Sequence, residues 1–277
     1  MVLEILVDPK KISGKPWEMF FIGAMYSLFG FALGYWIFKG YVTLIMVTFT
    51  TIASVPFFHK AIELEEAKET ESTSEVKLLE EHGKVVSMFT FLFLGFVTVF
   101  SLLYIVLPNG IVEEVFKAQI ETIVRINASP TGAFIASFKT FVEILSNNLK
   151  ILALCLAFSF FYGVGALFIL AWNASVMGAA IGDAIRSGLH NIVGIGGYFH
   201  VISTNVLGYF LHGVPEIVAY FIAALAGGII SVATIREKFG SEPFIKTMLD
   251  SIDLVLISFV LLVIAGLIEV FVSPSVG

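Results

Sequence analysis

The chain has 277 residues, of which 58% are hydrophobic and 14% are charged, and its mean hydropathy is +0.95. A soluble domain carries about 25% charged residues, so this composition excludes a soluble globular protein and indicates a polytopic membrane protein. The net charge of −6 argues against a nucleic-acid partner. The lone cysteine, Cys155, excludes a disulfide within the chain and a cysteine-based metal site.

The N-terminal part of the sequence predicts a helical hairpin followed by a charged segment. The first apolar span is expected over residues 17–38 and the second over residues 41–58, with only the Lys39-Gly40 link between them. Residues 59–84 then contain eight Glu and four Lys. We interpret this segment as two helical extensions that stand in water and are joined by a polar turn.

The middle part of the sequence predicts one further span and two surface helices. The third span, residues 85–107, carries no charge and is ended by Pro108-Asn109-Gly110. Residues 110–146 place apolar side chains on one side of a helix and charged side chains on the other. We therefore expect amphipathic helices that lie on the membrane surface or cap the bundle.

The remaining sequence predicts three or four crossings. Apolar spans are expected over residues 149–172, 215–235 and 252–272. Residues 173–213 are interrupted by glycine, asparagine and charged residues, a pattern typical of broken or re-entrant helices. The chain has seven spans if residues 194–211 cross the membrane and six if they do not. Seven spans and a cytoplasmic N-terminus place most of the 16 Lys and Arg on the cytoplasmic side.

Several polar side chains fall in segments that are otherwise typical of membrane spans. Burying a carboxylate in a membrane costs free energy unless the carboxylate has a partner or contacts water. His212 precedes Glu216 by four residues, so one helical turn places both on the same face. If the last two spans are antiparallel neighbours, Glu216 and Glu269 lie at the same depth, where they could bind a cation or share a proton. The predicted polar core comprises Asn147, Asn148, Asn173, Asp183, His212, Glu216 and Glu269.

Four sequence elements carry a resemblance to a known family. They are the Asn147-Asn148 pair before an apolar span, the Trp172-Asn-Ala-Ser-Val-Met-Gly178 turn, the His212-Gly-Val-Pro-Glu216 element with its Ala-Ala-Leu-Ala-Gly-Gly continuation, and the closing segment Ile-Ala-Gly-Leu-Ile-Glu269-Val-Phe-Val-Ser-Pro. Over roughly residues 85–275, and most strongly over residues 147–275, the chain resembles the stage II sporulation protein M family.

That family consists of small polytopic membrane proteins of bacteria and archaea, and its sporulation members act with cell-wall lytic enzymes as membrane anchors or scaffolds. The resemblance implies that His212 and Glu216 match the characteristic pair of the family and that Glu269 matches its terminal glutamate. Many relatives come from organisms that do not sporulate, so the engulfment role is not carried over to this chain.

Three functions stay open from the sequence. In a scaffold, the polar core satisfies backbone groups at helix breaks. In an ion or solute conduit, His212 and the carboxylates line a path. In a metal-dependent enzyme, His212 and Glu216 supply two ligands and His190 or His200 a third, although the His-Glu-x-x-His signature is absent.

We expect an all-α polytopic transmembrane bundle that forms one membrane domain over residues 1–277 and acts as a non-enzymatic scaffold or anchor without a cofactor. The expected location is the plasma membrane of a prokaryote. Besides the lipid bilayer, the candidate partners are a second copy of the chain, in a homodimer, and other membrane or envelope proteins. Three small-residue ridges are candidates for self-association: Gly30 with Gly34, Gly178 with Gly182, and Ala223 with Gly227.

Overall fold

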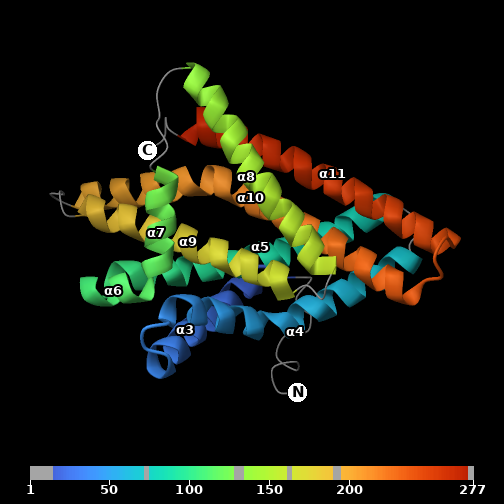
Figure 1. Ribbon diagram of the computed structural model, residues 1–277, viewed down its shortest axis with the longest axis horizontal. Helices are drawn as coiled ribbons and strands as arrows, with labels where there is room; N and C mark the ends of the chain where they lie inside the picture. Colours follow the sequence, from blue (N-terminus) through green and yellow to red (C-terminus); the bar gives the residue numbers. More distant parts are fainter. Residues whose placement is uncertain (1–14, 72–74, 128–133, 161–163, 190–194, 274–277) are drawn as a thin grey trace.

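The fold comes from a computed structural model that describes residues 15–71, 75–127, 134–160, 164–189 and 195–273. Within these ranges all regular structure is helical (Figure 1). In chain order the helices are α3 (Glu18–Ile37), α4 (Val42–Glu71), α5 (Glu75–Val106), α6 (Asn109–Val115), α7 (Lys117–Asn127), α8 (Phe134–Phe160), α9 (Val164–Leu189), α10 (Ile195–Arg236) and α11 (Glu242–Phe271).

Seven of these helices are long and apolar enough to cross a membrane: α3, α4, α5, α8, α9, α10 and α11. The two exceptions, α6 and α7, are short and lie between the third and fourth candidate spans. The prediction of an all-α polytopic bundle is therefore confirmed.

Two tight links join neighbouring spans into antiparallel hairpins. Gly40 lies between α3 and α4 with φ of 86°, and Gly240 lies between α10 and α11 with φ of 79°. Both values fall in the left-handed region, which glycine adopts without the penalty that a Cβ brings. These glycines let the chain reverse within a few residues, as the sequence predicted for the first hairpin.

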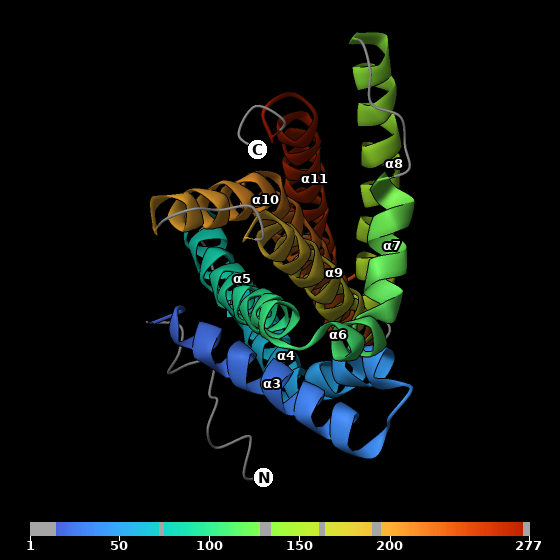
Figure 2. The same ribbon diagram turned by 90° about the vertical axis from the view of Figure 1, so that its left-hand side faces the viewer.

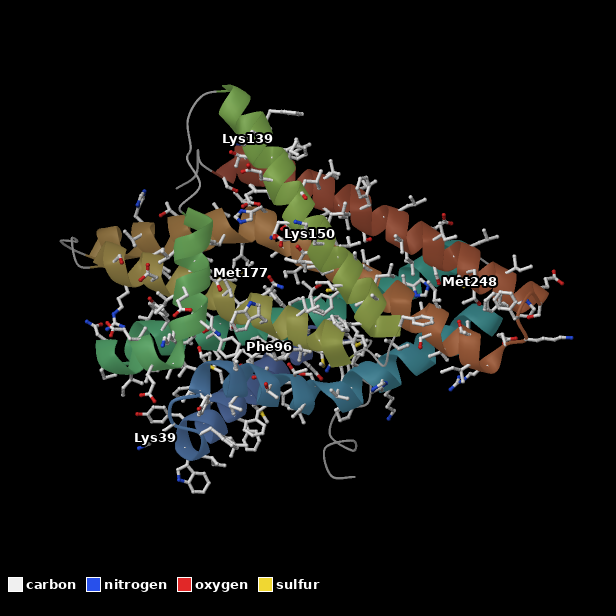
Figure 3. The ribbon with its side chains drawn as sticks, viewed as in Figure 1. Lys39, Phe96, Lys139, Lys150, Met177 and Met248 are labelled. Carbon is white, nitrogen blue, oxygen red and sulfur yellow. The ribbon has the colours of Figure 1, made fainter. Side chains whose placement is uncertain are left out.

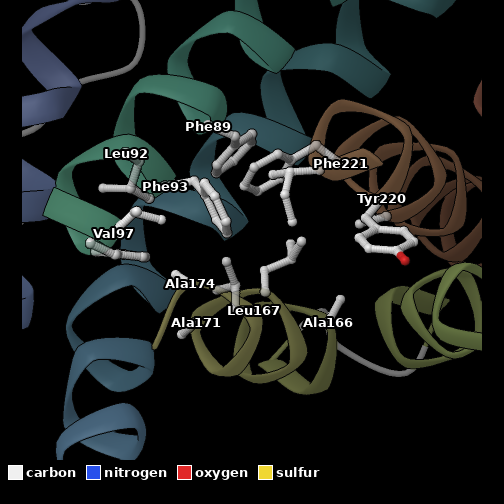
Figure 4. Packing of buried hydrophobic residues seen from close by; sticks show 14 of the residues in the cluster. Phe89, Leu92, Phe93, Val97, Ala166, Leu167, Ala171, Ala174, Tyr220 and Phe221 are labelled. Carbon is white, nitrogen blue, oxygen red and sulfur yellow. The ribbon is translucent and has the colours of Figure 1, made fainter. Parts of the chain in front are cut away.

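The centre of the bundle is formed by α5, α9 and α10, while α3 lies at one edge and α8 and α11 lie at the other (Figure 2). In the apolar stretch of α10, 72% of the residues are buried, against 17% in α8 and 28% in α11. Aromatic side chains of α5 meet α10 in the core, where the rings of Phe89 and Phe221 stack with centroids 5.3 Å apart (Figure 4). Small residues of α9, including Ala171 and Ala174, complete this contact.

Close helix contacts in the bundle depend on glycine. A Cβ on Gly95 would lie 2.2 Å from the carbonyl oxygen of Phe20, and one on Gly227 would lie 2.3 Å from that of Leu156. The three ridges predicted for self-association also pack within the chain. Gly30 contacts Met46 of α4, Gly178 contacts Phe100 of α5, and Gly227 contacts α8 as described. Other faces of the protein would therefore have to form a dimer.

Two predicted boundaries differ from the structure. The expected span over residues 149–172 is wrong, because it covers the end of α8 and the beginning of α9. Residues 173–213 do not form one uninterrupted crossing, as expected, because α9 ends at Leu189 and α10 begins at Ile195, but within the described residues neither helix is broken at the glycines. There α9 continues through Gly178 and Gly182, and α10 continues through Pro215. Residues 190–194, between these helices, lie outside the described ranges.

The charged and amphipathic segments are helical, as predicted. α4 continues to Glu71 and α5 begins at Glu75, so both arms of the 59–84 segment are helical. α6 and α7 bury Val112, Val115 and Phe116 and expose Glu114, Lys117 and Glu121. The second predicted surface helix is the first half of α8, which runs without interruption past Asn147 and Asn148.

Charged side chains such as Lys39 and Lys139 lie at the margins, whereas Phe96 lies inside the bundle (Figure 3).

Candidate polar core

Glu216 lies on α10 directly after Pro215, and protein groups from two helices contact its carboxylate. The Tyr220 hydroxyl, one turn further along the same helix, donates to Glu216 Oε1 at 2.7 Å. The side chain of Asn148, which comes from α8 and is buried, also hydrogen-bonds to Glu216. A carboxylate in a membrane helix is stabilised by such partners, and they connect α8 with α10.

Glu269 lies on α11 close enough to Glu216 for their charges to interact. Both side chains are partly buried. α10 and α11 are antiparallel and joined by a short link. A residue well before the end of α10 therefore faces a residue well after the beginning of α11. The last two spans are thus neighbours, as expected, and they bring these two carboxylates together.

His212 lies one turn before Glu216 and contacts the other end of the same hairpin. Its Nδ1 atom is 3.0 Å from Ser273 Oγ, four residues beyond Glu269. His212 therefore joins α10 to the residues directly after α11, and Glu216 and Glu269 form the next rung, one helical turn further into the hairpin. The His212 ring also approaches the backbone of Gly208 and the ring of Tyr209.

The other predicted polar residues do not join this group. Asn147 is exposed on α8. Asn173 donates to the carbonyl of Ile169 in its own helix at 2.8 Å. Asp183 is exposed on α9 and accepts from the Tyr104 hydroxyl of α5 at 3.0 Å. None of these described contacts involves His212, Glu216 or Glu269, so the polar core comprises Asn148, His212, Glu216, Tyr220, Glu269 and Ser273.

Arg186 of α9 binds the end of α5 and the residues that follow it. Its guanidinium donates to the carbonyls of Tyr104 and Leu107, at 2.9 and 3.0 Å, and to Asn109 Oδ1. The Tyr104 carbonyl lies in the last turn of α5, where carbonyls have no partner inside the helix, and Leu107 and Asn109 follow directly after that helix. Arg186 thus caps α5 from α9 and, with the Tyr104–Asp183 bond, fixes the two helices together at this end.

Sequence reasoning missed two polar residues that connect helices. Tyr220 was counted as part of an apolar span, although its spacing of four residues from Glu216 places it within reach. Gln119 of α7 is fully buried and bonds Thr43 of α4 and Ser175 of α9, at 2.8 and 3.0 Å. Gln119 falls in a segment predicted to be a surface helix, so no pattern in the sequence indicates its burial.

The polar core does not have the arrangement of a metal centre. Among the described residues, no group of three or more His, Cys, Asp and Glu side chains is placed to hold a metal ion. His200 lies three turns before His212 on α10 and is exposed, and His190 lies outside the described ranges. Within the described chain, the third ligand that a His212–Glu216 site would need is therefore not in place.

Comparison with known proteins agrees with this architecture. The family model of stage II sporulation protein M matches residues 20–274, which cover all seven candidate spans except the first two residues of α3. The chain belongs to the stage II sporulation protein M family. The family match also covers the first two spans and the charged segment, and it therefore begins closer to the N-terminus than the resemblance seen over residues 85–275.

One relative is archaeal. The chain is 32% identical over 166 residues to the uncharacterized protein MJ0793 of Methanocaldococcus jannaschii, and this match covers 57% of the chain and 85% of the relative. No solved structure matches the chain. Family membership and the seven apolar helices establish a multi-pass membrane protein.

Proposed function

We propose that this member of the stage II sporulation protein M family is a non-enzymatic membrane scaffold that anchors other envelope proteins. The observation that carries the proposal is the packing of α10. Ile217 and every residue from Ala219 to Ile229 are buried, so neighbouring helices surround this segment on all sides. A helix enclosed in this way is suited to a rigid framework.

The polar core supports the same function. The partners of Glu216 are side chains of α8 and α10, and the Ser159 hydroxyl of α8 donates to the carbonyl of Ala224 on α10. Hydrogen bonds between membrane helices contribute about 0.6 to 2 kcal/mol each. The core thus stabilises the contact of α8 with the centre of the bundle, where few other side chains of α8 are buried.

We place the protein in the plasma membrane of a prokaryote with its N-terminus in the cytoplasm. α4 ends and α5 begins at the same end of the bundle as the α10–α11 link (Figure 1). This end carries a cluster of basic residues, and the excess of Lys and Arg on the cytoplasmic side of membrane proteins supports the assignment. The residues are Lys60, Lys68, Lys77, Lys84, Arg236, Lys238 and Lys246.

Flux measurements on purified protein in liposomes test the scaffold. We expect proton, sodium and potassium leak rates equal to those of protein-free liposomes, for the wild type and for Glu216→Gln. In native membranes, chemical crosslinking should give the same adducts for both proteins, since the amide keeps an acceptor for Tyr220. A flux that is lost in Glu216→Gln while the protein stays folded would contradict the scaffold.

One observation favours a second function, a conduit for a cation or protons. Glu216 on α10 and Glu269 on α11 lie inside candidate spans and close enough for their charges to interact. Two neighbouring ionised carboxylates repel each other, and a cation or a proton between them relieves the repulsion. A conduit predicts flux that both Glu216→Gln and Glu269→Gln reduce, whereas Asn173→Ala, which alters only a bond within α9, leaves it unchanged.

A further inference from the structure

The two halves of α10 differ in their packing, and Pro215 lies between them. From Ala219 to Ile229 every residue is buried. From His200 to His212 no residue whose side chain is described is buried, and Ile202 and Leu207 are exposed at 42% and 50%. The change occurs within a few residues of Pro215, inside a helix of 42 residues.

The backbone of α10 is weakened where the packing changes. Pro215 has no N–H, so the carbonyl of Leu211 loses its helical partner, and the proline ring crowds the preceding turn. Kinks and hinges in long helices occur at such positions. Gly208 and Gly213 lie within two turns of the proline, and glycine has a low helix propensity. These residues therefore make this part of the helix more flexible.

The first half of α10 also extends beyond the end of its partner. α11 ends at Phe271, and His212 contacts Ser273, two residues beyond that end (Figure 1). Before His212, Val201 contacts Gly188 of α9, and the partly buried Val206, Tyr209 and Phe210 pack against the core. Directly after His212, Gly213 contacts Met177 of α9. These contacts involve side-chain ends, which yield more easily than backbone.

We propose that residues 200–212 form a hinged arm that turns about Pro215 and is held closed by the His212–Ser273 hydrogen bond. Because Glu216 and Glu269 form the next rung, opening the arm uncovers the carboxylate pair from this end of the bundle. The arm gives the framework one movable element, while residues 219–229 stay fixed. This inference rests on the packing of α10 and holds for a scaffold as well as for a conduit.

Hydrogen–deuterium exchange of the full-length protein in lipid nanodiscs tests the arm. In the wild type, amides of residues 200–214 should exchange about tenfold or more faster than those of residues 219–230. Ser273→Ala removes the partner of His212 and should raise exchange of residues 200–214 several-fold without changing residues 219–230. Ser258→Ala is the matched control, because Ser258 on α11 bonds only the carbonyl of Val255 in its own helix among the contacts described.

A reversible crosslink between residues 212 and 273 tests independently whether their contact holds the arm closed. In a Cys155→Ala background, His212→Cys and Ser273→Cys are joined by a short thiol-specific crosslinker that a reductant cleaves. Crosslinking should slow exchange of residues 200–214 to below the wild-type rate, and reduction should restore it. Equal exchange in the two halves of the wild type, or identical exchange in Ser273→Ala and Ser258→Ala, would overturn the proposal.

Discussion

At the scale of single residues, the polar groups with partners on other helices matter more than those that the sequence marks most strongly. Asn173 looks unusual in an apolar stretch, yet its described bond is to a carbonyl of its own helix, and Asp183 bonds Tyr104 of α5 rather than the group around Glu216. Asn148 was read as the polar residue that begins a span. In the structure it lies within α8 and hydrogen-bonds Glu216 from a helix far away in sequence.

Replacing Glu216 tests the polar core. Glu216→Leu removes the acceptor of the Tyr220 hydroxyl and the partner of Asn148, and should lower the free energy of unfolding by about 1–3 kcal/mol, because both groups stay buried. Glu216→Gln keeps an acceptor and should change stability little. Thermal unfolding in one detergent compares the variants, and a Leu variant that melts at the wild-type temperature would refute the network.

Gln119 offers a second test at the residue scale. Gln119→Leu has a similar volume but leaves the Thr43 and Ser175 hydroxyls without this amide, so we expect a loss of about 1–3 kcal/mol and faster proteolysis near α7. Thr48→Val is the control, since Thr48 is bonded to the carbonyl of Leu44 in its own helix. Equal stability of the two variants would show that the buried amide does not hold α7 on α4 and α9.

At the scale of helices, composition predicts spans well where polar residues or turns bound them, and poorly elsewhere. The first span was expected at residues 17–38 and is found at Glu18–Ile37. Residues 149–172 are mostly apolar, and after Lys150 they carry no charge, so hydropathy alone does not detect that one helix ends at Phe160 and another begins at Val164. Gly178 and Gly182 suggested a broken helix, but within α9 they allow close contact with α5. Which contact a glycine makes depends on the tertiary fold.

Two glycines of α5 provide a matched test of close helix contact. A Cβ on Gly95 would meet the backbone of Phe20 and Ala24 on α3, whereas one on Gly83 would meet nothing within 4 Å. Gly95→Ala should therefore destabilise the protein by about 1–3 kcal/mol, since two backbones must separate. Gly83→Ala should be neutral or slightly stabilising, because alanine favours helix. Similar melting temperatures for the two variants would contradict this packing.

At the scale of the whole molecule, the number of crossings decides where each link lies. With seven spans, the α3–α4 link follows one crossing and the α10–α11 link follows six, so they lie on opposite sides of the membrane. In a Cys155→Ala background, an impermeant thiol reagent added to intact cells should label Lys39→Cys and should label Lys238→Cys only after permeabilisation. Labelling of both from outside would show that one candidate span does not cross.

A homodimer is a further expectation at this scale. Since the predicted glycine ridges pack inside the chain, a dimer would use exposed apolar faces such as that of α11, which includes Leu256, Phe259 and Val260. Light scattering in several detergents and in nanodiscs should give twice the chain mass. Leu256→Trp should then weaken the dimer without lowering the melting temperature. A monomer under all conditions would contradict the expectation.

The unequal length of the spans has a consequence for the surrounding lipid. At 1.5 Å per residue, α10 with its 42 residues is about 63 Å long and α3 with its 20 residues about 30 Å. A typical hydrocarbon layer is about 30 Å thick, so it matches α3 upright but matches α10 only if that helix is strongly tilted or extends out of the layer. No flat bilayer of uniform thickness satisfies both helices upright. Hydrophobic mismatch therefore makes the protein sensitive to bilayer thickness, and it would concentrate in regions where the local thickness suits its longest helix.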